Sequence, residues 1–260
     1  NVRPGGRSIK LESDLQYLDE YLGVTDHPDY PTALNGLQVA GPSDVENIVV
    51  AVDASEASIS EAVNRGADLM IVHHGLFWGG LEPLTGRHFR KVRKLIEGGV
   101  ALYSCHLPLD SHSEVGNCAL LAGELELELQ GQFGVYKGTE IGWWGTLQES
   151  TTARGLATRL EGVLDTTVHL IPGGPDLIES VGVVTGGGAS FVEDAVAAGL
   201  HALVTGEGGH HSHFEAMELG ITLLFGGHYA TETFGVRALG AHLEQRFGLP
   251  WSFVDQPTGL

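Results

Sequence analysis

The sequence has few cysteines and no long apolar run. Cys105 and Cys118 are too few for a disulfide scaffold, which favours a reducing compartment. Cys105 is expected to be a buried structural thiol, because no motif beside it would activate the sulfur. No apolar stretch reaches the roughly 18–20 residues of a membrane span, and a charged run replaces the apolar core of a secretory signal. Residues 1–8 are interpreted as a trimmed leader or as an artificial remnant, and we expect a cytoplasmic protein that does not enter membranes.

Basic residues are also scarce, since 14 Lys and Arg stand against 33 Asp and Glu and give a formal charge of −19. Such a surface repels phosphate backbones, so broad nucleic-acid binding is not expected. A local basic pocket for a small anion is still compatible with this charge. One basic cluster indicates either a solvated helix face or a rim that contacts phosphate groups. It consists of Arg87, Arg90, Lys91, Arg93 and Lys94.

The 260 residues, 42% of them hydrophobic and 18% charged, indicate a globular chain of one or two domains. The order strand, helix, strand, helix, strand occurs twice along it. The predicted strands are 48–53, 68–72 and 100–104, then 181–184, 202–205 and 221–225; the predicted helices are 56–65 and 89–97, then 191–198 and 213–219. The repeat predicts an α/β fold with two similar domains from an internal duplication, each with a parallel or mixed sheet flanked by helices.

Between the two halves, residues 129–180 are rich in glycine and turn signals. This segment predicts strands over 130–133, 142–147 and 166–171 and a helix over 151–160. A helix over 235–247 and a strand over 251–254 close the chain, and that strand is expected to return to the first domain. The predicted domains are therefore residues 1–128 together with 228–260, and residues 129–227.

Histidine and carboxylate side chains follow predicted strands in both halves. His73 and His74 end one strand, Asp110 follows the next, and His228 and Glu232 follow the corresponding strand of the second half. The carboxyl ends of parallel strands meet at one sheet edge, so we expect these residues to lie together. Five imidazole and carboxylate ligands suit two ions that share a bridging oxygen. The sequence thus predicts two divalent metal ions per chain, with Zn, Fe, Mn and Ni equally compatible.

Each of these residues also has a structural interpretation when it is taken alone. A His-His pair after a strand is usually structural or exposed. His228 and Glu232 have the spacing of a pair on a helix surface, and Asp110 suits a turn or a helix cap after Pro108. Metal binding is favoured because the residues recur at equivalent places in the repeated unit.

Two further residues follow predicted strands close to the candidate ligands. His106 and Glu207 would each orient a ligand or move a proton, which makes them candidate catalytic residues, although a purely structural Glu207 is equally compatible. The cluster of His210, His211 and His213 has no carboxylate partner at strand-end spacing. We expect it to be an exposed loop or an interface.

Several motifs occur in an order typical of one family. They are Asn35-Gly-Leu-Gln-Val39, Ile71-Val-His-His-Gly-Leu-Phe-Trp78, His106-Leu-Pro-Leu-Asp110 with Gly116-Asn117, Thr185-Gly-Gly-Gly188, Thr205-Gly-Glu207 and Gly227-His-Tyr-Ala-Thr-Glu232. Over about residues 11–257 the chain resembles the NIF3-like dinuclear metal-centre proteins, also called GTP cyclohydrolase 1 type 2 homologs. The resemblance places the metal ligands on the same five residues, while Tyr229 stands where some relatives have a second histidine.

The resemblance also implies an assembly and an activity. Similar proteins form homohexameric rings with their metal sites facing an inner cavity. The implied activity is that of a metal-dependent hydrolase acting on a small-molecule substrate, in which water opens the purine ring of GTP and formate leaves. An alternative from another functional class is a metal-handling or regulatory scaffold that binds a metal or a partner without turnover.

Overall fold

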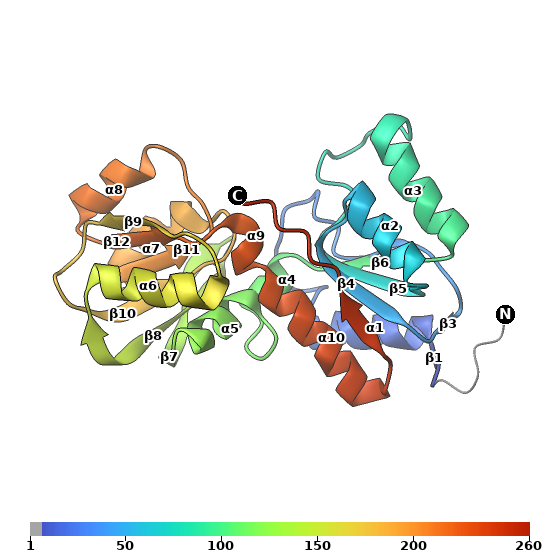
Figure 1. Ribbon diagram of the computed structural model, residues 1–260, viewed down its shortest axis with the longest axis horizontal. Helices are drawn as coiled ribbons and strands as arrows, with labels where there is room; N and C mark the ends of the chain where they lie inside the picture. The colour runs from blue at the N-terminus through green and yellow to red at the C-terminus, as the bar shows by residue number, and fades with distance from the viewer. Residues whose placement is uncertain (1–6) are drawn as a thin grey trace. The chain divides into compact units, whose positions relative to one another are not determined.

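A computed structural model describes residues 7–260; residues 1–6, which hold most of the segment interpreted as a leader, lie outside this description. The chain divides into two compact units (Figure 1). Unit 1 contains the chain up to Leu109 together with Val236–Gln256, and unit 2 contains Asp110–Gly235 together with Pro257–Leu260. Within the described residues, every helix is too short or too polar to cross a membrane.

The sheet of unit 1 has five strands in the order β13-β4-β5-β6-β2. The strands are β2 (Gly36–Val39), β4 (Ile48–Asp53), β5 (Leu69–His74), β6 (Ala101–Ser104) and β13 (Trp251–Phe253). All neighbours run parallel except β2, which pairs antiparallel with β6. The short strands β1 (Ile9–Lys10) and β3 (Asp44–Val45) form a separate antiparallel pair. The predicted return of the last strand to the first domain is confirmed by the pairing of β13 with β4.

Helices cover both faces of this sheet. They are α1 (Leu11–Leu22), α2 (Glu56–Asn64), α3 (Gly86–Gly98) and α10 (Thr233–Phe247). Figure 1 shows α2 and α3 on one face of the sheet and α1 and α10 on the other. Local signals set the ends of the crossover helices: Ser55 and Ser58 form a capping box at the start of α2, and Gly99 ends α3 in the left-handed region.

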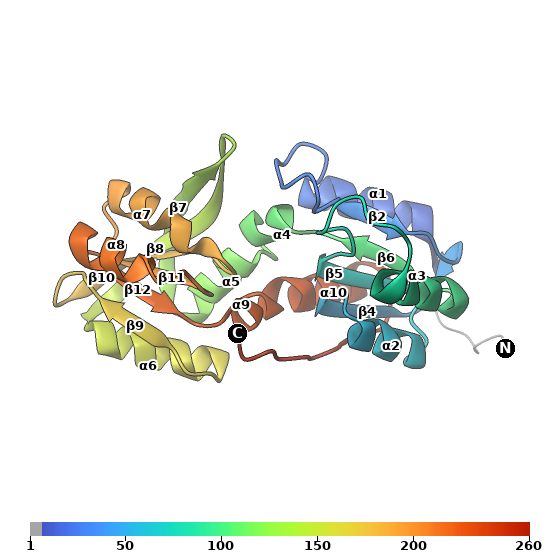
Figure 2. The same cartoon turned by 90° about the horizontal axis from the view of Figure 1, so that it is seen from above.

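The sheet of unit 2 has six strands in the order β7-β8-β10-β11-β12-β9. They are β7 (Leu127–Tyr136), β8 (Thr139–Thr151), β9 (His169–Pro172), β10 (Ile178–Val183), β11 (Ala202–Thr205) and β12 (Thr222–Phe225). Strands β10, β11 and β12 are parallel, and the outer pairings are antiparallel. In Figure 2, α6 (Ala153–Leu164) lies on one face of this sheet and α7 (Val192–Ala197) and α8 (Ser212–Leu219) lie on the other.

The run β4-α2-β5-α3-β6 of unit 1 has the same order and strand directions as β10-α7-β11-α8-β12 of unit 2, which is compatible with the predicted duplication. The structure divides the chain after Leu109 and after Gly235, whereas the predicted domain limits lie near residues 128 and 227. Helix α5 (Asn117–Glu124) was not predicted from the sequence, and its Cys118, Leu121 and Ala122 pack in the core of unit 2. That packing assigns the segment before residue 128 to unit 2.

Asp14 is an exception to the apolar burial in unit 1. It lies on the face of α1 that buries Leu11, Leu18 and Leu22, and its side chain is inaccessible to solvent. Within residues 7–260, neither of its carboxylate oxygens has a hydrogen-bond partner. Burial without a partner disfavours the charged form, and it raises the pKa of Asp14 to about 7.

The raised pKa of Asp14 predicts a loss of stability as the pH rises. Between the unfolded-state value, about 4, and about 7, only the folded protein holds this proton, so raising the pH through that window favours unfolding. The loss is at most about 4 kcal/mol, because a tenfold change in proton affinity is worth roughly 1.4 kcal/mol. Asp14→Asn should therefore raise the urea midpoint at about pH 8 more than at about pH 5. The exposed control Asp26→Asn should change both midpoints equally, and an Asp14→Asn variant that does the same would contradict the argument.

Candidate metal centre

Several polar side chains lie at the carboxyl edge of the unit 1 sheet. Strands β4, β5 and β6 are parallel, so their carboxyl ends lie at one edge. Asp53 ends β4 and pairs in register with His74 at the end of β5, while His106 follows β6. Buried apolar runs form these strands, and the first polar residues after each run are therefore delivered to the same place.

His73, His74 and His106 form a group that could hold a metal ion. Their ligand atoms lie within 4.8 Å of one another, and His73 is fully buried. Each ring has an acceptor for its Nδ1–H, and a fixed Nδ1–H makes Nε2 the nitrogen that presents a lone pair. The acceptors, each at 2.9 Å, are the Cys105 carbonyl for His73, the Asp53 carboxylate for His74 and the Asp29 carboxylate for His106.

Asp29 is held in place by a network of its own. Its carboxylate accepts hydrogen bonds from the Asn35 amide at 2.8 Å and from the Leu107 N–H at 2.9 Å, in addition to the one from His106. Burial alone would raise the pKa of Asp29. The hydrogen bond from His106, the charge of His106 and the hydrogen bond from Asn35 outweigh burial and hold this pKa below its usual value. Asp29 therefore stays ionised and orients the His106 ring.

Aromatic rings lie beside the three histidines. The Trp78 ring meets His106 edge to face, with centroids 4.7 Å apart, and meets His74 at 5.8 Å. Tyr30 lies 5.9 Å from His106 and 6.2 Å from Trp78. These rings border one side of the histidine group and contribute aromatic surface there.

In unit 2, Asp110 is fixed by two donors. It lies in the short helix α4 (Leu107–Ser111), and its Oδ1 accepts hydrogen bonds from the Asn117 amide at 2.9 Å and from the Thr185 hydroxyl at 3.0 Å. Asn117 in turn accepts a bond from the Gly235 N–H at 2.6 Å. Burial and the charge of Asp110 raise the pKa of the neighbouring Cys118 thiol to about 12. Cys118 is thus a structural thiol, and Cys105 is buried as expected.

His228 and Glu232 form the second part of the candidate site in unit 2. His228 begins the short helix α9 (His228–Thr231), which Glu232 ends. The His228 ring donates from Nδ1 to Glu207 at 2.7 Å, and its Nε2 lies 3.2 Å from the Glu232 carboxylate. The hydrogen bond with Glu232, reinforced by the bond with Glu207, raises the pKa of His228 to about 9 against the effect of burial. The two carboxylates thus make this position favourable for positive charge.

Gly186 makes room for this pair. It follows β10 with a φ of +63°, and a Cβ built on it would collide with Glu232 Oε1 and lie 3.2 Å from His228 Nε2. The Gly186 carbonyl accepts hydrogen bonds from the Gly206 and Glu207 N–H groups at 2.8 and 3.0 Å, so the backbone is fixed. A side chain at position 186 would occupy the space of the Glu232 carboxylate.

The structure places the candidate residues in two sets. His73, His74 and His106 belong to unit 1, whereas Asp110, Glu207, His228 and Glu232 belong to unit 2. The cluster of His210, His211 and His213 joins neither set: His210 and His213 pack edge to face against Phe214, and the cluster contributes to no metal-ligating group among residues 7–260. All three histidines are exposed, as expected, but His213 lies in α8 and His211 caps this helix, so only His210 lies in a loop.

Several residues that position the site were not predicted from the sequence. Asp53 had a usable signal, because it is the polar residue that ends a buried strand, as His74 does. Asp29 had none, since it lies in an irregular loop whose fold brings it 2.9 Å from a residue 77 positions later. The roles of Asn117 and Thr185 were also not predicted, although both occur in the family motifs.

The structure defines an α/β protein of two units with histidine, aspartate and glutamate side chains that could hold a metal ion. The chain belongs to the Duf34/NIF3 (NGG1p interacting factor 3) family, which matches it over residues 10–258. It is 47% identical over 247 residues to the GTP cyclohydrolase 1 type 2 homolog of Halobacterium salinarum, covering 93% of this chain and 96% of that one. The corresponding protein of Deinococcus radiodurans is 42% identical over 256 residues, with coverages of 98% and 97%.

Solved structures agree with this assignment. The crystal structure of TTHA1606 from Thermus thermophilus superposes with a TM-score of 0.88 at 42% identity, covering 97% of this chain and all of that one. The structure of protein ybgI, described as being of unknown function, superposes with a TM-score of 0.90 at 36% identity, with the same coverages. The predicted fold class and family are therefore confirmed.

Proposed function

We propose that the protein is a metal-dependent hydrolase whose chain holds two divalent ions on His73, His74, Asp110, His228 and Glu232. One observation carries the proposal: the histidine ligands donate Nδ1–H to a carbonyl or carboxylate acceptor within their own unit. Ligating histidines characteristically have such an acceptor, which fixes the tautomer and raises the basicity of Nε2.

The residues fit a pair of divalent ions in both number and type. Three imidazoles and two carboxylates match divalent first-row metals, and carboxylates balance the charge of two close cations. Gly186 keeps the space that the Glu232 carboxylate occupies. The sequence separation supports combining the two sets. Asp110 follows His106 by only four residues, and the chain leaves unit 1 and enters unit 2 between Leu109 and Asp110. Zn, Fe, Mn and Ni all suit such a ligand set.

The remaining residues have defined tasks in this proposal. When bound, two divalent ions would act as Lewis acids. They would also lower the pKa of water, so that hydroxide is available as a nucleophile near neutral pH. His106, oriented by Asp29, holds or moves a proton at Nε2. Glu207 orients His228 through its bond to Nδ1. Trp78 and Tyr30 border one side of the histidine group and offer aromatic surface to a planar substrate.

The proposed substrate is a purine nucleotide. Relatives at 36–47% identity bear the name GTP cyclohydrolase 1 type 2 homolog. A site that activates water suits the addition of one water to purine C8, which opens the ring to a formamide, and the hydrolysis of that formamide by a second water, which releases formate and leaves the amine. The alternative is a metal-handling or regulatory scaffold without turnover, which the scarcity of bases for a triphosphate favours. We further propose a cytoplasmic homohexamer, which mass determination by light scattering would test.

Metal content tests the proposed ligands. After reconstitution, elemental analysis should find about two divalent ions per chain. His74→Ala and Glu232→Ala should each lower this content, because each removes one ligand from a shared pair. The matched control His211→Ala removes an imidazole from the exposed cluster and should leave the content unchanged. A wild-type content of one ion or fewer would exclude the dinuclear centre.

A further inference from the structure

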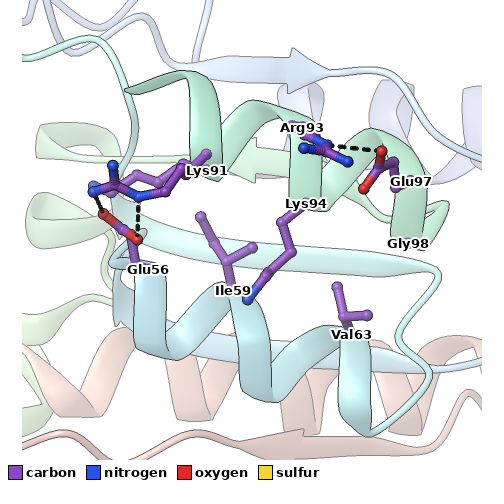
Figure 3. A pocket seen from close by; sticks show the side chains of 9 residues that line it. Glu56, Ile59, Val63, Lys91, Arg93, Lys94, Glu97 and Gly98 are labelled. Atoms are coloured by element: carbon purple, nitrogen blue, oxygen red, sulfur yellow. Dashed lines mark hydrogen bonds and ion pairs between the residues drawn. The ribbon is translucent and has the colours of Figure 1, made fainter. Parts of the chain in front are cut away.

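A groove runs between α2 and α3 in unit 1 (Figure 3). It encloses about 400 Å³, which lies within the usual range for small-molecule sites. Val63 of α2 is partly exposed in the groove, the fully buried Ile59 lies beneath it, and basic residues of α3 form its rim. The full lining is Glu56, Ile59, Val63, Arg90, Lys91, Arg93, Lys94, Glu97 and Gly98.

The charges around the groove do not balance. Arg90 makes a two-point ion pair with Glu56 at 2.6 and 2.9 Å, and Arg93 pairs with Glu97 at 2.8 Å. Among the described residues, no carboxylate lies within ion-pair distance of Lys91 or Lys94, and the Lys94 ammonium donates only to the Ser60 hydroxyl at 2.6 Å. Four cations and two carboxylates therefore leave two positive charges in excess in a chain whose net charge is −19.

Lys91 separates this groove from an ordinary solvated helix face. Its side chain is half-buried, whereas those of Arg90 and Arg93 are exposed. Burial, together with the neighbouring charge of Arg87, lowers the pKa of Lys91 against the opposing charges of Glu56 and Asp53. A partly desolvated ammonium without a paired carboxylate is stabilised when an anion supplies the missing charge.

We propose that the α2–α3 groove binds a small organic anion, namely a phosphate or carboxylate group on a short alkyl or aryl body. The anionic group binds Lys91 and Lys94, and the body covers Val63 above the buried Ile59. Charge complementarity selects the anion, and the apolar surface selects an organic anion over inorganic phosphate. The ion pairs of Arg90 and Arg93 hold the rim in place. This site is independent of the proposed metal centre.

Calorimetric titration of the full chain with octyl phosphate tests the proposal. Octyl phosphate should bind at least about tenfold more tightly than inorganic phosphate or octanol, because neither of these supplies both contacts. Affinity should be the same with metal-free and metal-reconstituted protein, which excludes binding of the phosphate group to metal ions. Hydrogen exchange in wild-type protein should slow in peptides that cover α2 and α3.

The variants distinguish a built site from general attraction. Lys91→Gln and Lys94→Gln should each weaken octyl phosphate binding at least about fivefold, since each removes a direct charge contact. Arg87→Gln removes the same charge from the same helix but does not line the groove, so it should weaken binding less than about twofold. Equal losses in the three variants, binding no tighter than that of inorganic phosphate, or protection outside α2 and α3 would each overturn the proposal.

Discussion

Asp110→Asn should reduce any metal-dependent hydrolase activity by orders of magnitude while the fold survives. Asn117 and Thr185 both donate to Oδ1 of Asp110. An asparagine that keeps these two bonds must turn its oxygen toward them, which places its NH₂ group where the second carboxylate oxygen was. A donor at that position cannot bind a cation, and the negative charge that helps to hold two close cations is lost as well. The neighbouring core is unchanged, so stability should change little.

Formate release from GTP, measured with Mn, Fe or Zn, checks this expectation. Activity should vanish with a chelator, return with added metal and stay low in Asp110→Asn, while circular dichroism reports a native fold. Asp176→Asn is the matched control, because it makes the same chemical change at an exposed position of unit 2. Persistence of activity in Asp110→Asn or in metal-free protein would show that these residues are not the catalyst.

The alternative function has its own expected result. If the wild-type protein binds two ions but turns over no nucleotide, phosphoester or amide, a metal-handling or regulatory scaffold becomes the better account. Metal content and catalysis are therefore measured on the same preparation. A chain that binds metal without turnover would retain the proposed centre and lose only the proposed reaction.

The repeated strands were predictable because each is a continuous buried apolar run, and the helices between them because their apolar residues recur at helical spacing. The strand predicted over 48–53 matches β4, and that over 202–205 matches β11, since each is a short apolar run bounded by polar residues and turns. Helix α5 was missed because it is buried on most sides and has no polar face to reveal its period. The first domain limit differed for the same reason, since it depends on which core α5 joins.

The candidate ligands were predictable from their positions at strand ends, but the residues that orient them were mostly not. Asp53 shares the strand-end signal, whereas Asp29 and Asn117 act across 77 and 118 residues of sequence through loop geometry. Gly186 was visible only as one glycine in a run of three. Position 186 requires glycine because its φ is positive and because the Glu232 carboxylate occupies the space of a side chain. No local sequence pattern reveals this packing.

Gly186→Ala should impair metal binding although residue 186 is not a ligand. The Gly186 carbonyl is bound by two backbone N–H groups, and its own N–H donates to the Thr231 hydroxyl at 3.0 Å, so the backbone cannot move aside. The new Cβ must therefore displace the Glu232 carboxylate, which lies in its place. Elemental analysis should find a metal content as low as that of Glu232→Ala. The left-handed backbone should also cost about 1–2 kcal/mol of stability.

Gly199→Ala separates these two effects. Gly199 has a similar φ of +71° in the same unit, and a Cβ there would have no neighbour within 4 Å among the described atoms. It should lower the urea midpoint by a similar backbone cost and leave metal content at the wild-type level. A Gly186→Ala variant with as much bound metal as Gly199→Ala would show that the observed place of the Glu232 carboxylate is not needed for binding. Low metal in Gly186→Ala alone would assign the loss to the displaced carboxylate, because backbone strain is common to both variants.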